Sequence, residues 1–161
     1  MKVYIYQRFM YFFNVGEIWD EDGKTKYILE RNGKVGQNFR ILDTSGHETA
    51  IVKQKISLFK NVFLIIINGR EIEVRFRHKM KINGEGYCEI TGLDLTTGGN
   101  IDKHEYTIDN AEKTLACVKN AMFNDIECYE LEYGDDVNED EITALFVAIE
   151  LAKSVEANNC P

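Results

Sequence analysis

Residues 138–157 read NEDEITALFVAIELAKSVEA, and this stretch decides the fold. Within residues 142–152 only Thr143 and Glu150 are not apolar, and a period of 3.6 residues places both on one narrow stripe of a helix. A helix that is apolar on nearly every side must be enclosed by the rest of the chain. Its large core side chains are those of Ile142, Leu145, Phe146 and Ile149.

The start of this helix carries its own signals. Asn138 is a favourable N-cap, and Glu141 follows three residues later in a capping-box pattern. Val137 can pack on Ile142 across the cap. The apolar run of about eleven residues is shorter than the roughly twenty that cross a bilayer, so we do not expect an integral membrane protein.

The composition indicates one packed domain over residues 1–161. The chain is 44% hydrophobic and holds a single proline, which argues for a globule rather than a disordered chain. Its net charge of −8 argues against a nucleic-acid surface, which needs a positive field. Residues 1–13 are interrupted by Lys2, Gln7 and Arg8, so they lack the apolar core of a signal peptide. We therefore expect a cytoplasmic protein.

The cysteines and histidines form no metal-binding or catalytic pattern. There is no C-x-x-C pair and no histidine at ligand spacing, so neither a metal nor another cofactor is expected. The three histidines are scattered, and no triad can be assembled from the sequence. The cysteines are Cys88, Cys117, Cys128 and Cys160. The first three are read as small strand residues and the last as a free thiol.

Everything before Asn138 is typical of strands joined by tight turns. Asn68-Gly69, between strands expected at residues 61–67 and 70–77, is the strongest hairpin signal. Asp43-Thr44-Ser45-Gly46 resembles the aspartic-protease pattern Asp-Thr/Ser-Gly, but Ser45 interrupts it and a turn explains all four residues. Further turns are expected at residues 20–23, 31–33, 84–86 and 98–100, and further strands at residues 17–19, 26–30, 87–90, 105–108, 114–119 and 127–133.

A short internal repeat suggests two similar β-halves. Phe39-Arg40-Ile41 followed by Ala50-Ile51-Val52-Lys53 recurs as Tyr106-Thr107-Ile108 followed by Ala116-Cys117-Val118-Lys119. About 137 residues at about 10–12 per strand and turn give on the order of a dozen strands. A barrel of about eight strands has room only for side chains, so an enclosed helix requires more. The expected fold is mainly β, a closed antiparallel barrel of about twelve strands enclosing the hydrophobic C-terminal helix.

Turn and core positions spread over nearly the whole chain occur in a characteristic order. They are Gln7, Ile18, Asp20-Glu21-x-Gly23, Tyr27, Phe39-x-Ile41-x-Asp43-x-x-Gly46, Lys53-Gln54-Lys55, Leu58 and Ala144-x-x-x-Ala148-Ile149. This order resembles the LURP-one-related family, which shares the tubby C-terminal-like fold with tubby proteins and phospholipid scramblases. The resemblance implies a twelve-stranded barrel around a C-terminal helix. It implies little about activity: tubby proteins bind phosphoinositides, but no tubby phosphoinositide motif matches this chain residue by residue.

The basic cluster, at the end of the second hairpin arm, consists of Arg75, Arg77, His78, Lys79 and Lys81. Convergent donors of this kind can bind an anion or a lipid head group. Glu71 and Glu73 lie on the same exposed face and can instead pair with the two arginines. The acidic run at residues 135–141 lacks the ligand spacing of a calcium loop, and helix capping explains it.

No catalytic signature is present, so we expect a non-enzymatic binding or scaffold module. Its barrel exterior or rim would meet a phospholipid head group, a small ligand or a protein partner. The alternative is an enzyme with a polar pocket and perturbed titratable groups at one barrel mouth. Glu150, if the helix buries it, must have a hydrogen-bonding partner.

Overall fold

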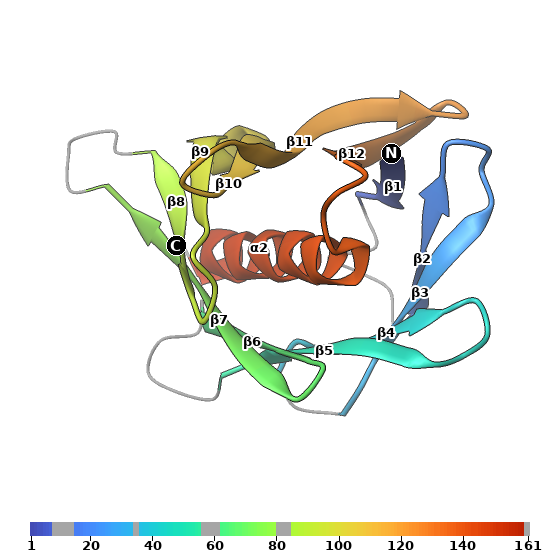
Figure 1. The fold of residues 1–161 in the computed structure, drawn as a ribbon, viewed down its shortest axis with the longest axis horizontal. Coiled ribbons are helices and arrows are strands. Elements are labelled where there is room, and N and C mark those ends of the chain that lie inside the picture. The colour runs from blue at the N-terminus through green and yellow to red at the C-terminus, as the bar shows by residue number, and fades with distance from the viewer. Residues whose placement is uncertain (8–14, 34–35, 56–61, 80–84, 160–161) are drawn as a thin grey trace.

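The computed structural model describes residues 1–7, 15–33, 36–55, 62–79 and 85–159, with side chains described as far as Val155. Twelve antiparallel strands close into a barrel in which each strand pairs with its sequence neighbours and β1 closes the ring with β12. The ring surrounds helix α2, Glu139–Asn159 (Figure 1). This mainly β barrel with its C-terminal helix confirms the predicted fold class. The strands are β1 Lys2–Tyr6, β2 Val15–Asp20, β3 Thr25–Arg31, β4 Asn38–Asp43, β5 Glu48–Gln54, β6 Val62–Ile67, β7 Arg70–His78, β8 Gly86–Thr91, β9 Thr96–Asn100, β10 Glu105–Asp109, β11 Thr114–Phe123 and β12 Ile126–Tyr133.

Helix α2 is capped by Asn138, whose Oδ1 accepts a hydrogen bond from the Glu141 backbone N–H at 3.1 Å. The Glu141 carboxylate does not return to the cap. It accepts a hydrogen bond from Arg70 of β7 at 2.7 Å, which fixes the first turn to the barrel wall. The helix packs chiefly on β5, β6 and β7. The side chains that are at most 2% exposed include Ile142, Leu145, Phe146 and Ile149.

Thr143 is fully buried, and its Oγ1 has no hydrogen-bond partner among the described residues. A hydroxyl that loses water without gaining a partner is destabilising. We therefore expect Thr143→Val, which keeps the shape of the side chain, to leave the free energy of unfolding unchanged or to raise it by about 1 kcal/mol. Urea denaturation would check this, with Thr143→Ser as the control that keeps the hydroxyl. A clear loss of stability in the valine variant alone would contradict it.

The two halves of the sequence repeat occupy equivalent positions in two hairpins. In both β4–β5 and β10–β11, the aromatic residue of the first strand lies opposite the valine of the second, and the isoleucine lies opposite the alanine. All these residues are buried. The opposed pairs are Phe39–Val52 and Ile41–Ala50 in one hairpin and Tyr106–Val118 and Ile108–Ala116 in the other. The repeat therefore records the same inward-facing core positions on two sides of the ring.

Most predicted turns are found where the sequence placed them. Asn68 and Gly69 join β6 to β7 with φ of 50° and 73°, as a two-residue hairpin requires. Asp43 Oδ1 accepts the backbone N–H groups of Ser45 and His47, so the protease-like sequence is a turn. Of the turn expected at residues 84–86, only the end is described, and Gly86 begins β8.

The turn predicted at residues 98–100 is wrong. Gly98 and Gly99 lie inside β9 and pair with Thr107 and Tyr106 of β10. A Cβ on Gly98 would lie 2.7 Å from Thr107 Oγ1, and one on Gly99 would lie 2.6 Å from the carbonyl oxygen of Glu105. Close approach of the two strands therefore requires these glycines, not a chain reversal.

The ring closes between the first and last strands. β1 pairs with residues 128–132 of β12, and the Met1 amino group donates to the carbonyl oxygen of Tyr133 at 2.8 Å. The thinnest seam lies between β8 and β9, which share one residue pair, Glu89 and Thr96. Within the described ranges, no helix is both long and apolar enough to cross a membrane.

Candidate functional site

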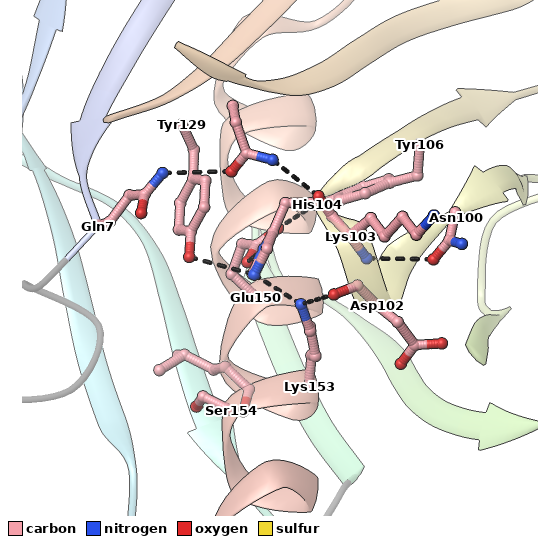
Figure 2. A network of polar contacts seen from close by, with 12 residues as sticks. Gln7, Asn100, Asp102, Lys103, His104, Tyr106, Tyr129, Glu150, Lys153 and Ser154 are labelled. Atoms are coloured by element: carbon pink, nitrogen blue, oxygen red, sulfur yellow. Dashed lines mark hydrogen bonds and ion pairs between the residues drawn. The ribbon is translucent and has the colours of Figure 1, made fainter. Parts of the chain in front are cut away.

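The acidic residue in the apolar centre of α2, Glu150, is 2% exposed and has two partners in the barrel wall. One carboxylate oxygen accepts the Tyr106 hydroxyl at 3.0 Å, and the other lies 2.7 Å from His104 Nδ1 (Figure 2). Burial, together with the charge of Glu150, raises the pKa of Tyr106 well above its usual value, so its hydroxyl stays protonated and donates. Glu150 therefore has the partners that a buried carboxylate needs.

His104 follows the 3-10 helix η1, Ile101–Lys103, in a left-handed backbone conformation with φ 56°. Its ring stacks on Tyr129 with centroids 4.3 Å apart. Because Nδ1 faces the carboxylate, an acceptor, that nitrogen donates in this contact, which leaves Nε2 to meet the remaining partners of the ring. Lys153 Nζ lies 2.5 Å from Nε2, and the Tyr129 hydroxyl lies 3.3 Å from it.

Lys153 connects this cluster to the end of the barrel. It lies on α2 one turn after Glu150, and its Nζ also donates to the carbonyl oxygen of Asp102 at 2.6 Å. Burial lowers the pKa of Lys153 against the opposing attraction of the Glu150 and Asp102 charges. Asp102 in turn accepts the Gly86 backbone N–H at 2.7 Å. The network thus ties α2 to η1 and to the start of β8, beside the thin β8–β9 seam.

A groove lies next to this network, on the β11–β12 hairpin. We call it the rim groove; it has a volume of about 440 Å³ and is lined by Gln7, Asn120, Ala121, Met122 and Glu127. Alternation along the strands puts Asn120 and Met122 of β11 on the same face as the buried Val118. The rim groove therefore continues the inner face of the barrel past its mouth.

The rim groove shares a wall with the buried network. Gln7 Nε2 donates to Asn120 Oδ1 at 3.2 Å, and Asn120 Nδ2 donates to the carbonyl oxygen of Lys103 at 2.8 Å, immediately before His104. The other side of the groove is less constrained. The Met122 side chain is 63% exposed, and the exposed Glu127 carboxylate has no partner among the described residues. The groove therefore offers one fixed polar wall and one open, acidic and apolar wall.

The structure spreads the basic cluster along the exposed side of β7. Arg75 lies 3.4 Å from Glu73, and Arg77 lies 2.8 Å from Glu89 of β8. Lys79 lies 3.7 Å from Glu85. Of the carboxylates that face these cations, Glu73 lies on β7 itself, whereas Glu89 lies on β8 and Glu85 just before it.

Of the other two members of the basic cluster, only His78 lies in the described part of the chain. His78 packs edge-on against Phe76 with ring centroids 5.1 Å apart, and Lys81 lies outside the described residues. Head-group binding by this cluster stays a prediction, and the pairing of its cations argues for the solvated-face interpretation.

Vesicle flotation tests the head-group interpretation directly. We expect no retention on phosphatidylserine-containing vesicles at low or high ionic strength, because the described cations already face carboxylates. Retention at low salt that Arg77→Ala weakens would contradict this expectation, with Lys53→Ala on β5 as the charge-matched control.

The acidic run before and within the first turn of α2 binds the far end of the helix to the barrel. Lys26 pairs with Glu139 at 2.6 Å, and the Tyr27 hydroxyl donates to Asp140 at 2.6 Å. Asp136 pairs with Lys113. Within the described ranges, no group of three or more His, Cys, Asp or Glu side chains is placed to hold a metal ion.

Sequence reasoning did not bring His104, Glu150 and Lys153 together. They come from η1–β10 and α2, and His104 and Glu150 are 46 positions apart in the chain. The available signal was Glu150 itself, a carboxylate in an otherwise apolar helix that needed a partner. The rim groove had no signal, because the predicted strand at residues 114–119 ended before it.

Comparison with known proteins adds information about the fold. No protein-family model and no curated protein matches the sequence. Among solved structures, the X-ray structure of the Arabidopsis thaliana protein AT5G01750 is similar, with a TM-score of 0.64 and 12% sequence identity. The match covers 98% of this chain and 91% of the plant chain. The chain therefore shares the fold of this plant protein over nearly its whole length.

Proposed function

We propose that this protein is a non-enzymatic binding module that takes a protein partner at the rim groove. The observation that supports this most is the contrast between the barrel interior and the groove. The interior is filled by α2, whose residues 142–152 are each at most 2% exposed, and its carboxylate is already paired. The groove is open and presents an exposed thioether and a carboxylate that has no partner in the described part of the chain.

The family resemblance agrees with a binding role. The positions that resemble the LURP-one-related family are turns and core residues rather than catalytic groups, and the chain shares its fold with the plant protein. A lipid head group is the less favoured partner, because Arg75, Arg77 and Lys79 of the basic cluster face carboxylates. An acidic groove on a chain of net charge −8 favours a basic partner.

NMR titration of the ¹⁵N-labelled protein with a pool of soluble, lysine-containing heptapeptides tests this proposal. The expected result is a set of saturable shifts at Gln7, Asn120, Met122 and Glu127. Glu127→Gln should weaken binding about tenfold, because a charge-assisted contact is lost. Glu132→Gln, on the outer face of the same strand, is the matched control and should bind like the wild type. Shifts that avoid the groove, or none, would overturn the proposal.

The alternative is an enzyme acting at the barrel mouth, and one arrangement favours it. Lys153, His104 and Glu150 lie in the order of nucleophile, base and orienting carboxylate, with an amine 2.5 Å from an imidazole nitrogen. The Lys153 ammonium would give a proton to His104, and the resulting amine would add to the carbonyl carbon of an aldehyde. Loss of water from this adduct would leave an imine.

Trapping with propionaldehyde and cyanoborohydride distinguishes this alternative. If Lys153 is a nucleophile, it is labelled faster than the exposed Lys53, and His104→Gln slows labelling at Lys153 but not at Lys53. Labelling of Lys153 that is slower than labelling of Lys53 would remove the enzyme hypothesis at this site.

A further inference from the structure

Strand β11 continues past the end of the strand on its other side. It pairs with β12 through Phe123, whereas its pairing with β10 stops at Val118, opposite Tyr106. In Figure 1 the β11–β12 hairpin runs beyond β10 along the top of the view. Residues 119–123 of β11 therefore have a strand partner on one side only within the described chain.

The turn geometry identifies which backbone groups face the open side. Asn124 and Asp125 both have positive φ, 49° and 63°, and connect the opposed pair Phe123 and Ile126 as a two-residue hairpin. The pair that flanks such a turn exchanges ladder hydrogen bonds, and the pattern alternates along the strands. The backbone N–H and C=O groups of Phe123 thus bond to β12, whereas those of Met122 point away from β12.

The same alternation applies to Asn120, whose backbone groups also point away from β12, while its side chain contacts Lys103 just before β10. Past Val118, no described residue supplies a backbone hydrogen bond to β11 from the β10 side. Asn120 and Met122 are also exposed. An unpaired strand edge of this kind is a template for an added strand, and natural proteins usually cover or shorten such edges.

We propose that the partner of the rim groove is an extended, basic polypeptide segment that adds as a strand to the open edge of β11 at residues 119–123. This inference rests on the proposed function and specifies its ligand. Only an extended polypeptide supplies backbone donors and acceptors at the spacing of Asn120 and Met122. Alternate side chains of the added strand lie over the groove face, where Met122 offers an apolar contact.

The negative charge of the groove and of the whole chain favours a positively charged partner. Glu127 lies opposite Met122 on β12, about 10 Å or two strand spacings from an added strand. A lysine or arginine side chain reaching across β11 can meet its carboxylate at that distance. The net charge of −8 also disfavours a second copy of this chain in the same place, because two copies repel each other.

The test uses a peptide of alternating lysine and valine, flanked by threonine, and the full-length protein. We expect Met122→Pro, which removes an edge N–H that does not serve the β11–β12 ladder, to weaken binding at least tenfold. Met122→Ala, which keeps that N–H, should weaken binding less than threefold. Backbone N-methylation of alternate peptide residues should abolish binding to the wild type, and hydrogen exchange should slow at Asn120 and Met122 when the peptide binds.

The outcomes separate this inference from the proposed function. If Met122→Pro bound the peptide with undiminished affinity and still showed NMR shifts at the groove residues, strand addition would be overturned. The proposal that a partner binds at the groove would stand. Peptide-induced shifts that avoid the groove would overturn both. Sedimentation of the wild type as a dimer that Met122→Pro converts to a monomer would assign the edge to a second copy and overturn the basic partner. A circular-dichroism melt of each variant shows whether loss of binding reflects loss of folding.

Discussion

Leu145→Ala and Phe146→Ala are each expected to lower the free energy of unfolding by about 2–5 kcal/mol. Both side chains are completely buried on α2, and the ring of strands surrounds the helix. Each substitution therefore leaves a cavity that the closed barrel cannot readily collapse. The loss is a large share of the 5–15 kcal/mol that stabilises a typical domain.

Chemical denaturation measures this effect, with Met122→Ala as the matched control. The control also shortens a large apolar side chain, but Met122 is 63% exposed, so its cost should stay below about 0.5 kcal/mol. A chain ending at Gly134 lacks α2 and should lose cooperative unfolding altogether. If the truncated chain unfolded cooperatively with near-wild-type stability, the helix would be peripheral and this account of the core would be wrong.

Glu150→Ala is expected to lower the free energy of unfolding by about 3–5 kcal/mol. The substitution leaves the Tyr106 hydroxyl without an acceptor in a fully buried site and removes the anion that faces His104. Glu150→Gln should cost less, because an amide oxygen can still accept the tyrosine hydroxyl. Urea denaturation of both variants measures the order of the two effects.

A double-mutant cycle with Tyr106→Phe assigns the effect to the hydrogen bond. The two substitutions should be non-additive by about 1–2 kcal/mol, because each removes the same contact. Strict additivity would mean that Glu150 is stabilised through another route. Ser154→Ala is the control on the same helix, since its hydroxyl donates to the carbonyl oxygen of Leu151 within that helix.

The sequence predicted those parts of the fold that depend on local physics. The Asn138 cap and the Asn68-Gly69 hairpin are local arrangements of a few residues, and both are found as expected. Gly98 and Gly99 were misread because a glycine needed for close strand contact looks the same in the sequence as one needed for a turn. Local patterns do not reveal which backbone a glycine must approach.

The candidate site depends on long-range contacts, so only part of it could be predicted from the sequence. Burial of Glu150 could be inferred from its apolar neighbours, but the identity of His104 as its partner could not. The extension of β11 to Phe123 was missed because Lys119 and Asn120 are polar and resemble the end of a strand. The resulting open edge follows from where β10 stops, which is a property of the assembled barrel.

Closure of the ring by β1 and β12 has a consequence for how the chain is made. The first strand pairs with β2 nearby, but its second partner lies 120 or more positions away, and the helix that fills the barrel follows all twelve strands. During synthesis on a ribosome, the β-meander must therefore remain open with its apolar face uncovered until α2 leaves the exit tunnel. Closure of the barrel should therefore be slow, and the nascent chain should depend on chaperones to avoid aggregation before α2 is available.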